Sequence, residues 1–215
     1  MMAMGRGLKG YDIGSARIAV FVRHGESITN VEERISDDIE GFPLTALGRG
    51  QAEDAGRALE KLPRVDHIYT SPVLRAVQTS NIIAKHIDIM PDVDRLLTER
   101  GCGTANNRRF KTKEEHRKFV LEQVGNSCPG YESWGSMMDR MERFSRKLRR
   151  GEVSVAVSHR QPIASALALV MGKDEIQMWS VGPINGSITI IDFENEGSDA
   201  VLAFGSPMVP KVLGG

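Results

Sequence analysis

Three times this chain runs through a short apolar stretch of strand type and then begins a helix, and this alternation constrains the fold more than any other feature. The stretches cover residues 17–22, 65–70 and 153–158. The first lacks an alternation of polar and apolar residues, which is typical of a strand buried on both faces in a parallel sheet. Strands that alternate with helices predict a three-layer α/β/α sandwich around a mostly parallel sheet.

Caps and apolar stripes mark the expected helices. Thr45 caps a helix that ends at Pro63, with apolar residues at helical spacing from Leu47 to Leu62. Ser71 and Pro72 predict a second helix start. We expect one face of this helix to pack on the sheet and Arg75 to lie on a different face. The residues of the expected sheet-facing stripe are Val73, Val77, Ser80, Ala84 and Ile87.

The second half of the chain completes the predicted domain. A methionine-rich stripe from Met137 to Leu148 predicts a helix packed on the sheet and closed by Gly151, and a further helix opens at Pro162. Segments 187–193 and 200–204 indicate a hairpin, which would add an antiparallel edge to the sheet. We therefore expect a flexible lead-in at 1–16 and a single domain at 17–215, in which 100–130 form a lid insertion.

Composition argues against several classes of partner. The 28 lysines and arginines balance 28 aspartates and glutamates, so no overall field favours nucleic acid or an anionic membrane. No run of about eighteen apolar residues occurs, so we expect neither export nor membrane spanning. Cys102 and Cys128 lack metal-ligand spacing, which favours a reduced chain in the cytoplasm.

The residues that end the three apolar stretches predict a site. Parallel strands bring His24, Arg75 and His159 to one edge of the sheet, outside the carboxyl ends where ligands gather in such folds. Imidazoles and arginines without supporting carboxylates or thiolates suit a metal ion poorly. They suit a phosphate well, because a guanidinium pairs with phosphate oxygens. His24, at the tight Arg23-His24-Gly25 turn, is the better candidate for a nucleophile.

Five motifs in order add a family resemblance: RHGESITN, PLTALGRGQA, YTSPVLRAVQT, the glutamate after LLT, and VSHRQPI. Together they resemble the histidine phosphatase superfamily, in its phosphoglycerate mutase-like branch, over residues 17–193. The resemblance implies the phosphoglycerate mutase-like fold and assigns a role to each matching residue. His24 would be phosphorylated, and Glu99 would supply the proton to the leaving oxygen. The residues that would bind the phosphoryl group are Arg23, Asn30, Arg75 and His159.

Three assignments stay open at this level. Glu132 is a second acid in the middle of the chain and competes with Glu99 as the proton donor. Arg160 stands where family members often have glycine, and it either lines the pocket or turns outward. Glu26 either holds the pocket arginines in place or is a surface acid.

The resemblance covers both phosphatases and mutases. Cys102 stands where the cofactor-dependent mutases have tyrosine, and no glycine-leucine-asparagine-lysine stretch follows, so we expect a metal-independent phosphatase of the histidine acid phosphatase type. Its substrate would be a small anionic phosphomonoester, with no cofactor. A mutase that uses 2,3-bisphosphoglycerate is the alternative, because Arg108 and Arg109 would suit a carboxylated substrate. The basic run 108–118 is either a solvated helix face or part of an anion-favouring lid.

Two further readings compete less well with an enzyme of this kind. A catalytically inactive relative with a binding role would not need the complete set of pocket residues. A dinucleotide-binding domain would carry a Gly-x-Gly-x-x-Gly stretch after the first strand, and the chain has none there.

Overall fold

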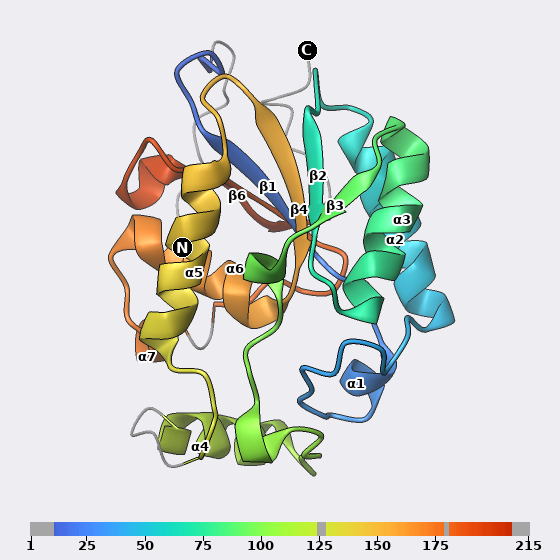
Figure 1. Ribbon diagram of the computed structural model, residues 1–215, viewed down its shortest axis with the longest axis vertical. Coiled ribbons are helices and arrows are strands. Elements are labelled where there is room, and N and C mark those ends of the chain that lie inside the picture. Colours follow the sequence, from blue (N-terminus) through green and yellow to red (C-terminus); the bar gives the residue numbers. More distant parts are fainter. Residues whose placement is uncertain (1–10, 124–127, 179–180, 208–215) are drawn as a thin grey trace.

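The computed structural model describes residues 11–123, 128–178 and 181–207, and its centre is a six-stranded sheet in the order β3-β2-β4-β1-β5-β6 (Figure 1). The strands are β1 Ile18–Arg23, β2 His67–Thr70, β3 Pro91–Val93, β4 Val153–Ser158, β5 Ile188–Asp192 and β6 Val201–Ser206. β1, β4, β2 and β3 run parallel, and β5 pairs antiparallel with both β1 and β6. The mostly parallel sheet with an antiparallel edge is thereby confirmed, whereas β3 was not expected.

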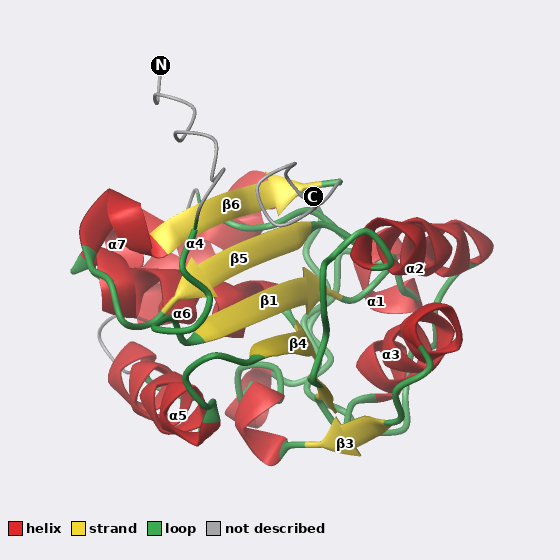
Figure 2. Ribbon diagram, turned by 90° about the horizontal axis from the view of Figure 1, so that it is seen from above, coloured by secondary structure: helices red, strands yellow, loops and turns green. Residues whose placement is uncertain are grey.

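Helices cover both faces of the sheet, as Figure 2 shows, with α2 and α3 on one side and α5 and α6 on the other. The α-helices are α1 Ile28–Val31, α2 Ala46–Leu59, α3 Leu74–Ile87, α4 Lys113–Gln123, α5 Trp134–Lys147, α6 Arg160–Met171 and α7 Glu175–Met178. Alternate residues of the central strands face opposite layers: Val20 belongs to the core on the α2 and α3 side, and Phe21 packs on Phe144 of α5. None of the described helices is long and apolar enough to cross a bilayer.

The expected helix after β2 differs from the prediction in its start and in the burial of Arg75. α3 begins at Leu74, two residues later than expected, and the Ser71 hydroxyl oxygen accepts a hydrogen bond from the Val73 amide at 3.2 Å. Its buried residues are Arg75, Ala76, Thr79, Ser80 and Ile83. Arg75 therefore lies on the buried face, because polar partners inside the protein accept its hydrogen bonds. In α2, Leu47 is also an exception, since it is 59% exposed.

Two glycines allow the turn after β1 to pack closely against the start of α2. A Cβ on Gly25 would lie 2.1 Å from the carbonyl oxygen of Gly48, and a Cβ on Gly48 would lie 1.9 Å from that of Glu26. Both distances are too short for any side chain. Thr45 caps α2 as expected, since its hydroxyl oxygen accepts from the Gly48 amide at 3.0 Å. The first two sequence motifs thus form a single packed unit, which fixes the backbone beside His24.

Candidate active site

His24, Arg75 and His159 meet where three parallel strands end, as the sequence predicted. His24 follows β1, Arg75 lies in the first turn of α3 after β2, and His159 caps α6 directly after β4. The two imidazole rings lie 5.0 Å apart between centroids. The three residues are at most 2% exposed, so each polar atom among them needs a partner inside the protein or on a ligand.

The environment of His24 selects one tautomer and one charge state. Nδ1 lies 2.7 Å from the carbonyl oxygen of Gly25, and since a carbonyl can only accept, Nδ1 carries the proton. Nε2 therefore presents its lone pair, and the Nε–H of Arg75 donates to it at 3.3 Å. Burial, together with the charges of Arg75 and Arg23, holds the pKa of His24 well below its usual value of 6.5. The ring is neutral at pH 7, as a nucleophile requires.

The two arginines are each anchored by a backbone carbonyl. Arg75 Nη2 donates to the oxygen of Ser36 at 2.9 Å, and Arg23 Nη1 donates to the oxygen of Pro183 at 2.9 Å. Burial and the nearby charge of Arg160 lower the pKa of Arg23 to about 10, so this side chain stays cationic at neutral pH. In each guanidinium one nitrogen is thus held by a backbone carbonyl, and other N–H groups can still donate to a ligand.

His159 is oriented by a serine that follows β2. Its Nε2 lies 2.8 Å from the Ser71 hydroxyl oxygen, which also accepts from the Val73 amide. The serine hydroxyl is therefore free to donate to Nε2, and His159 then carries its own proton on Nδ1. That Nδ1 has no hydrogen-bond partner among the described residues, and it lies 3.8 Å from Oε2 of Glu99.

Three buried nitrogens around the two rings lack a partner within the described part of the chain: Nε of Arg23, Nη1 of Arg75 and Nδ1 of His159. An unsatisfied buried donor costs about 1–3 kcal/mol. These three come from three different strand exits, and all surround the imidazole whose lone pair is presented. The arrangement is suited to bind a tetrahedral anion next to Nε2 of His24.

The two candidate acids occupy different places. Glu132 is bound by Arg140, whose Nε and Nη2 donate to its two carboxylate oxygens at 2.7 and 3.0 Å. Among the described residues, Oε1 of Glu99 accepts a hydrogen bond from the Arg100 amide at 2.9 Å, and its Oε2 lies 3.8 Å from Nδ1 of His159. The structure brings Glu99 to the site and ties Glu132 into an ion pair.

Asn30 and Glu26 lie beside the catalytic turn with separate partners. Asn30 Oδ1 accepts from Asn185 Nδ2 at 3.1 Å, and the same amide donates to the His24 carbonyl oxygen at 3.1 Å. Glu26 accepts a hydrogen bond from the Thr45 hydroxyl at 2.8 Å. Glu26 thus holds the start of α2, a role that neither of the two sequence readings anticipated.

Arg160, the first residue of α6, lines a cavity of about 590 Å³ that Arg23 also lines. Its side chain thus lines a cavity next to the strand ends, and a contact between Arg160 and a phosphoryl group stays a prediction. No cluster of three or more potential metal ligands occurs among the described side chains, and the expected absence of a cofactor stays a prediction.

Sequence reasoning missed the groups that orient the side chains of the candidate site. Ser71 was singled out only as a helix cap, although its place after β2 signals that it lies at the site. Asn185, beside His24, belongs to the loop before β5 and carries no local motif. The carbonyl oxygens of Ser36 and Pro183 leave no signal in a sequence, because every residue has one.

Comparisons with known proteins identify the family and the fold of this chain. The sequence model of the histidine phosphatase superfamily, branch 1, matches residues 19–204. A 2,3-bisphosphoglycerate-dependent phosphoglycerate mutase from Thermoplasma acidophilum is 31% identical over 180 residues, covering 83% of this chain and 88% of that protein. Phosphoserine phosphatase 1 from Hydrogenobacter thermophilus is 28% identical over 184 residues, covering 81% and 86%. The structure of the α-ribazole phosphatase from Shigella flexneri shares the fold, with a TM-score of 0.70 and 20% identity over 89% of this chain and 98% of that one.

Proposed function

This chain belongs to the histidine phosphatase superfamily, branch 1, and on that premise we propose that it is a metal-independent phosphomonoester hydrolase which works through a phosphohistidine at His24. One observation carries the proposal. A neutral imidazole presents its Nε2 lone pair next to three buried nitrogens that lack partners among the described residues. Small phosphorylated molecules are the expected substrates, and the names of the two enzymes from Thermoplasma and Hydrogenobacter point to the same class.

The proposed reaction has two steps. Nε2 of His24 attacks phosphorus, the bond between phosphorus and the ester oxygen breaks, and Glu99 gives its proton to the leaving oxygen. Water then attacks the phosphohistidine while Glu99 takes back a proton, which releases phosphate and restores neutral His24. In both steps the cationic and N–H groups of Arg23, Arg75 and His159 stabilise the charge on the transferring oxygens. The amide of Asn30 would add a further donor.

A mutase remains the alternative, because the Thermoplasma relative is named as one. In a mutase the phosphoryl group returns to a phosphoglycerate, and 2,3-bisphosphoglycerate primes His24. The arginines that would suit the carboxylate are engaged elsewhere: Arg108 stacks on Phe110 and Phe119, and Arg109 pairs with Glu32. This supports hydrolysis over transfer. An inactive binding relative is less compatible with the complete site.

Phosphorus NMR on the intact protein, with a chelator present, tests the proposal. The substrates are an aryl phosphate and 3-phosphoglycerate with a little 2,3-bisphosphoglycerate. We expect free phosphate, abolished in His24→Ala and retained in His86→Ala, a surface histidine that pairs with Glu53 and Glu60. Accumulation of 2-phosphoglycerate ahead of phosphate would establish the mutase instead, and silence on both substrates would favour the inactive relative.

A further inference from the structure

Resting on the proposed function, we propose that Arg160 binds a second anionic group on the substrate, placed within a few bonds of the scissile phosphoester. The preferred substrates would then be phosphomonoesters whose leaving alcohol carries a carboxylate or another phosphate. The strand-end residues described above bind the phosphoryl group, whereas this inference concerns the part of the substrate that leaves.

The cavity beside the site is far larger than a phosphoryl group needs. Its volume is about 590 Å³, which falls within the range typical of pockets for small molecules. Arg23 lies at its phosphoryl end, and an apolar wall is formed by Ile176, Pro183 and Ile184. The opposite side comes from α4, through Glu114, His116 and Arg117. A leaving group of several carbon atoms therefore has room between the catalytic edge and α4.

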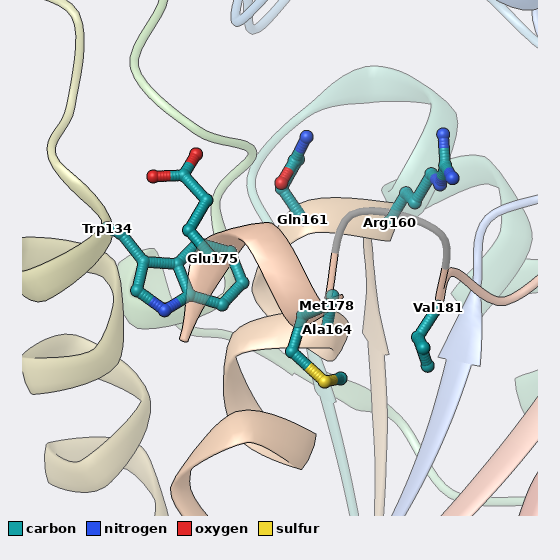
Figure 3. Close-up of a pocket in the computed structure, with 7 residues that line it drawn as sticks. All are labelled: Trp134, Arg160, Gln161, Ala164, Glu175, Met178 and Val181. Atoms are coloured by element: carbon teal, nitrogen blue, oxygen red, sulfur yellow. The ribbon is translucent and has the colours of Figure 1, made fainter. Parts of the chain in front are cut away.

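Arg160 lines this cavity together with Arg23 and with His116 of α4. It directly follows His159, and its charge contributes to lowering the pKa of both Arg23 and His116. In Figure 3, Arg160 points away from Trp134 and Glu175, which flank a second hollow of about 10 Å³. That hollow has room for no more than about one water molecule. A substrate must therefore meet Arg160 from the side of the larger cavity.

The other ionisable groups that line the cavity are less suited to bind an anionic group on the leaving alcohol. Arg117 pairs with Glu114 at 3.8 Å, and their side chains are 57% and 78% exposed. Burial, with the charge of Arg160, lowers the pKa of His116 to about 4, which leaves that imidazole neutral. Arg23 is occupied with the phosphoryl group in the proposed mechanism. We select Arg160 because it lines the cavity directly after His159, and because a guanidinium binds a carboxylate or phosphate through paired hydrogen bonds.

Gly182 makes room for the Arg160 side chain. A Cβ on this glycine would lie 2.1 Å from Nε of Arg160 and 2.9 Å from its Cζ. Because the guanidinium ends a flexible side chain, Gly182→Ala should displace it without removing its charge. This gives a second way to perturb the same contact, independent of any change to Arg160 itself.

The test measures kcat/KM for matched substrate pairs that differ in the second anion. D-3-phosphoglycerate is paired with glycerol 3-phosphate for the carboxylate, and fructose 1,6-bisphosphate with fructose 6-phosphate for the phosphate. We expect the wild type to prefer the charged member of at least one pair, and Arg160→Gln to reduce that preference by about tenfold, as expected for loss of a hydrogen bond to a charged group. Gly182→Ala should reduce it similarly, and adding it to Arg160→Gln should change little further. Arg117→Gln at the rim is the matched control and should keep the preference.

If Arg160→Gln lowered kcat/KM equally for both members of each pair, the inference would be overturned. Arg160 would then act on the transferring phosphoryl group, which both members carry. A wild type that does not discriminate would also overturn it. The pair that shows the preference distinguishes a carboxylate from a second phosphate. Failure of the proposed function looks different, because no His24-dependent phosphate release would then be found with any of the four substrates.

Discussion

The strand-end site and the 100–130 segment are built in different ways. His24, Arg75 and His159 are buried and take their positions from paired strands and the helices that follow them. The 100–130 segment instead has its own small apolar cluster, which includes Phe110 and Phe119 and is separate from both cores on the sheet. Figure 1 shows α4 of this segment beyond the end of the sheet, on the same side as α1. The sheet thus positions the two histidines and Arg75, while residues of a separately packed unit line the cavity that Arg23 and Arg160 also line.

The two regions are nevertheless joined through one loop. The backbone of residues 33–35 pairs with 107–110: Ile35 donates to Arg108, Asn107 donates to Ile35, and Phe110 donates to Glu33, at 2.9–3.0 Å. Asp38 then accepts from the side-chain amides of Asn106 and Asn107 at 2.7 and 2.8 Å. Ser36 lies between these contacts, and its carbonyl accepts from Arg75. The position of Arg75 therefore depends on how the 100–130 segment holds this loop.

The largest predicted effect is on the strand-end side. Arg75→Lys keeps the charge but removes the fork that contacts His24 and Ser36 at once. We expect kcat/KM for an aryl phosphate to fall at least about a hundredfold, the size found when one preorganised donor to a developing charge is lost. Steady-state kinetics, with the melting temperature measured beside them, check this.

The matched control for Arg75 lies on the 100–130 segment. Arg109→Lys changes an arginine that is 57% exposed and paired with Glu32, and such surface pairs contribute little. It should alter kcat/KM by less than about twofold. If Arg75→Lys and Arg109→Lys lowered kcat/KM to the same extent, it would be wrong to assign the phosphoryl-binding arginine to the strand ends alone.

A smaller effect is predicted where the two regions meet. Asp38→Ala removes both contacts to Asn106 and Asn107, and the loop that presents the Ser36 carbonyl to Arg75 should loosen. We expect kcat for an aryl phosphate to fall by about tenfold with little change in KM, since charge stabilisation in the transition state would suffer most. Asp54→Ala, which changes an exposed carboxylate bound to Arg57, is the control. A fall in melting temperature with unchanged kcat would mean that Asp38 only stabilises the fold.

The sequence predicted the strand-end site far better than the contacts that orient it. His24 and His159 end apolar runs, and the topology rule for parallel strands was enough to bring them together. The stripe predicted for α3 is confirmed at Val73 and Ser80, which are buried, and at Ala84 and Ile87, which pack on the core. The prediction did not include Arg75 in the buried face, because hydrophobic periodicity counts an arginine as a surface residue, whereas Ser36 and His24 make its burial possible. β3 is only three residues long and mostly exposed, so its sequence carries no apolar run. The role of Ser36 arises from its backbone and from pairing with a distant segment, which no local pattern records.

A further prediction concerns stability rather than activity, and it separates the two buried histidines of the site from His86. The pKa of His24 and that of His159 are both held well below 6.5, first by burial and then by the charge of Arg75. Below pH 6.5 the unfolded chain therefore takes up protons at these rings while the folded chain does not. The free energy of unfolding should fall as the pH drops from 7 to 5, by up to about 1.4 kcal/mol per pH unit for each ring.

Two variants show which histidines cause this dependence of the free energy of unfolding on pH. His24→Asn removes one buried ring and should make the fall in stability from pH 7 to 5 shallower in urea titrations. His86→Asn should make it steeper: hydrogen bonds that His86 donates to Glu53 and Glu60 raise the pKa of His86. This ring therefore contributes stability that is present below pH 6.5 and lost as the pH rises through its folded pKa. An unchanged slope in His24→Asn would contradict the neutral, buried imidazole on which the proposed nucleophile depends. The same titration thus tests a stability cost and a catalytic requirement, because one buried ring accounts for both.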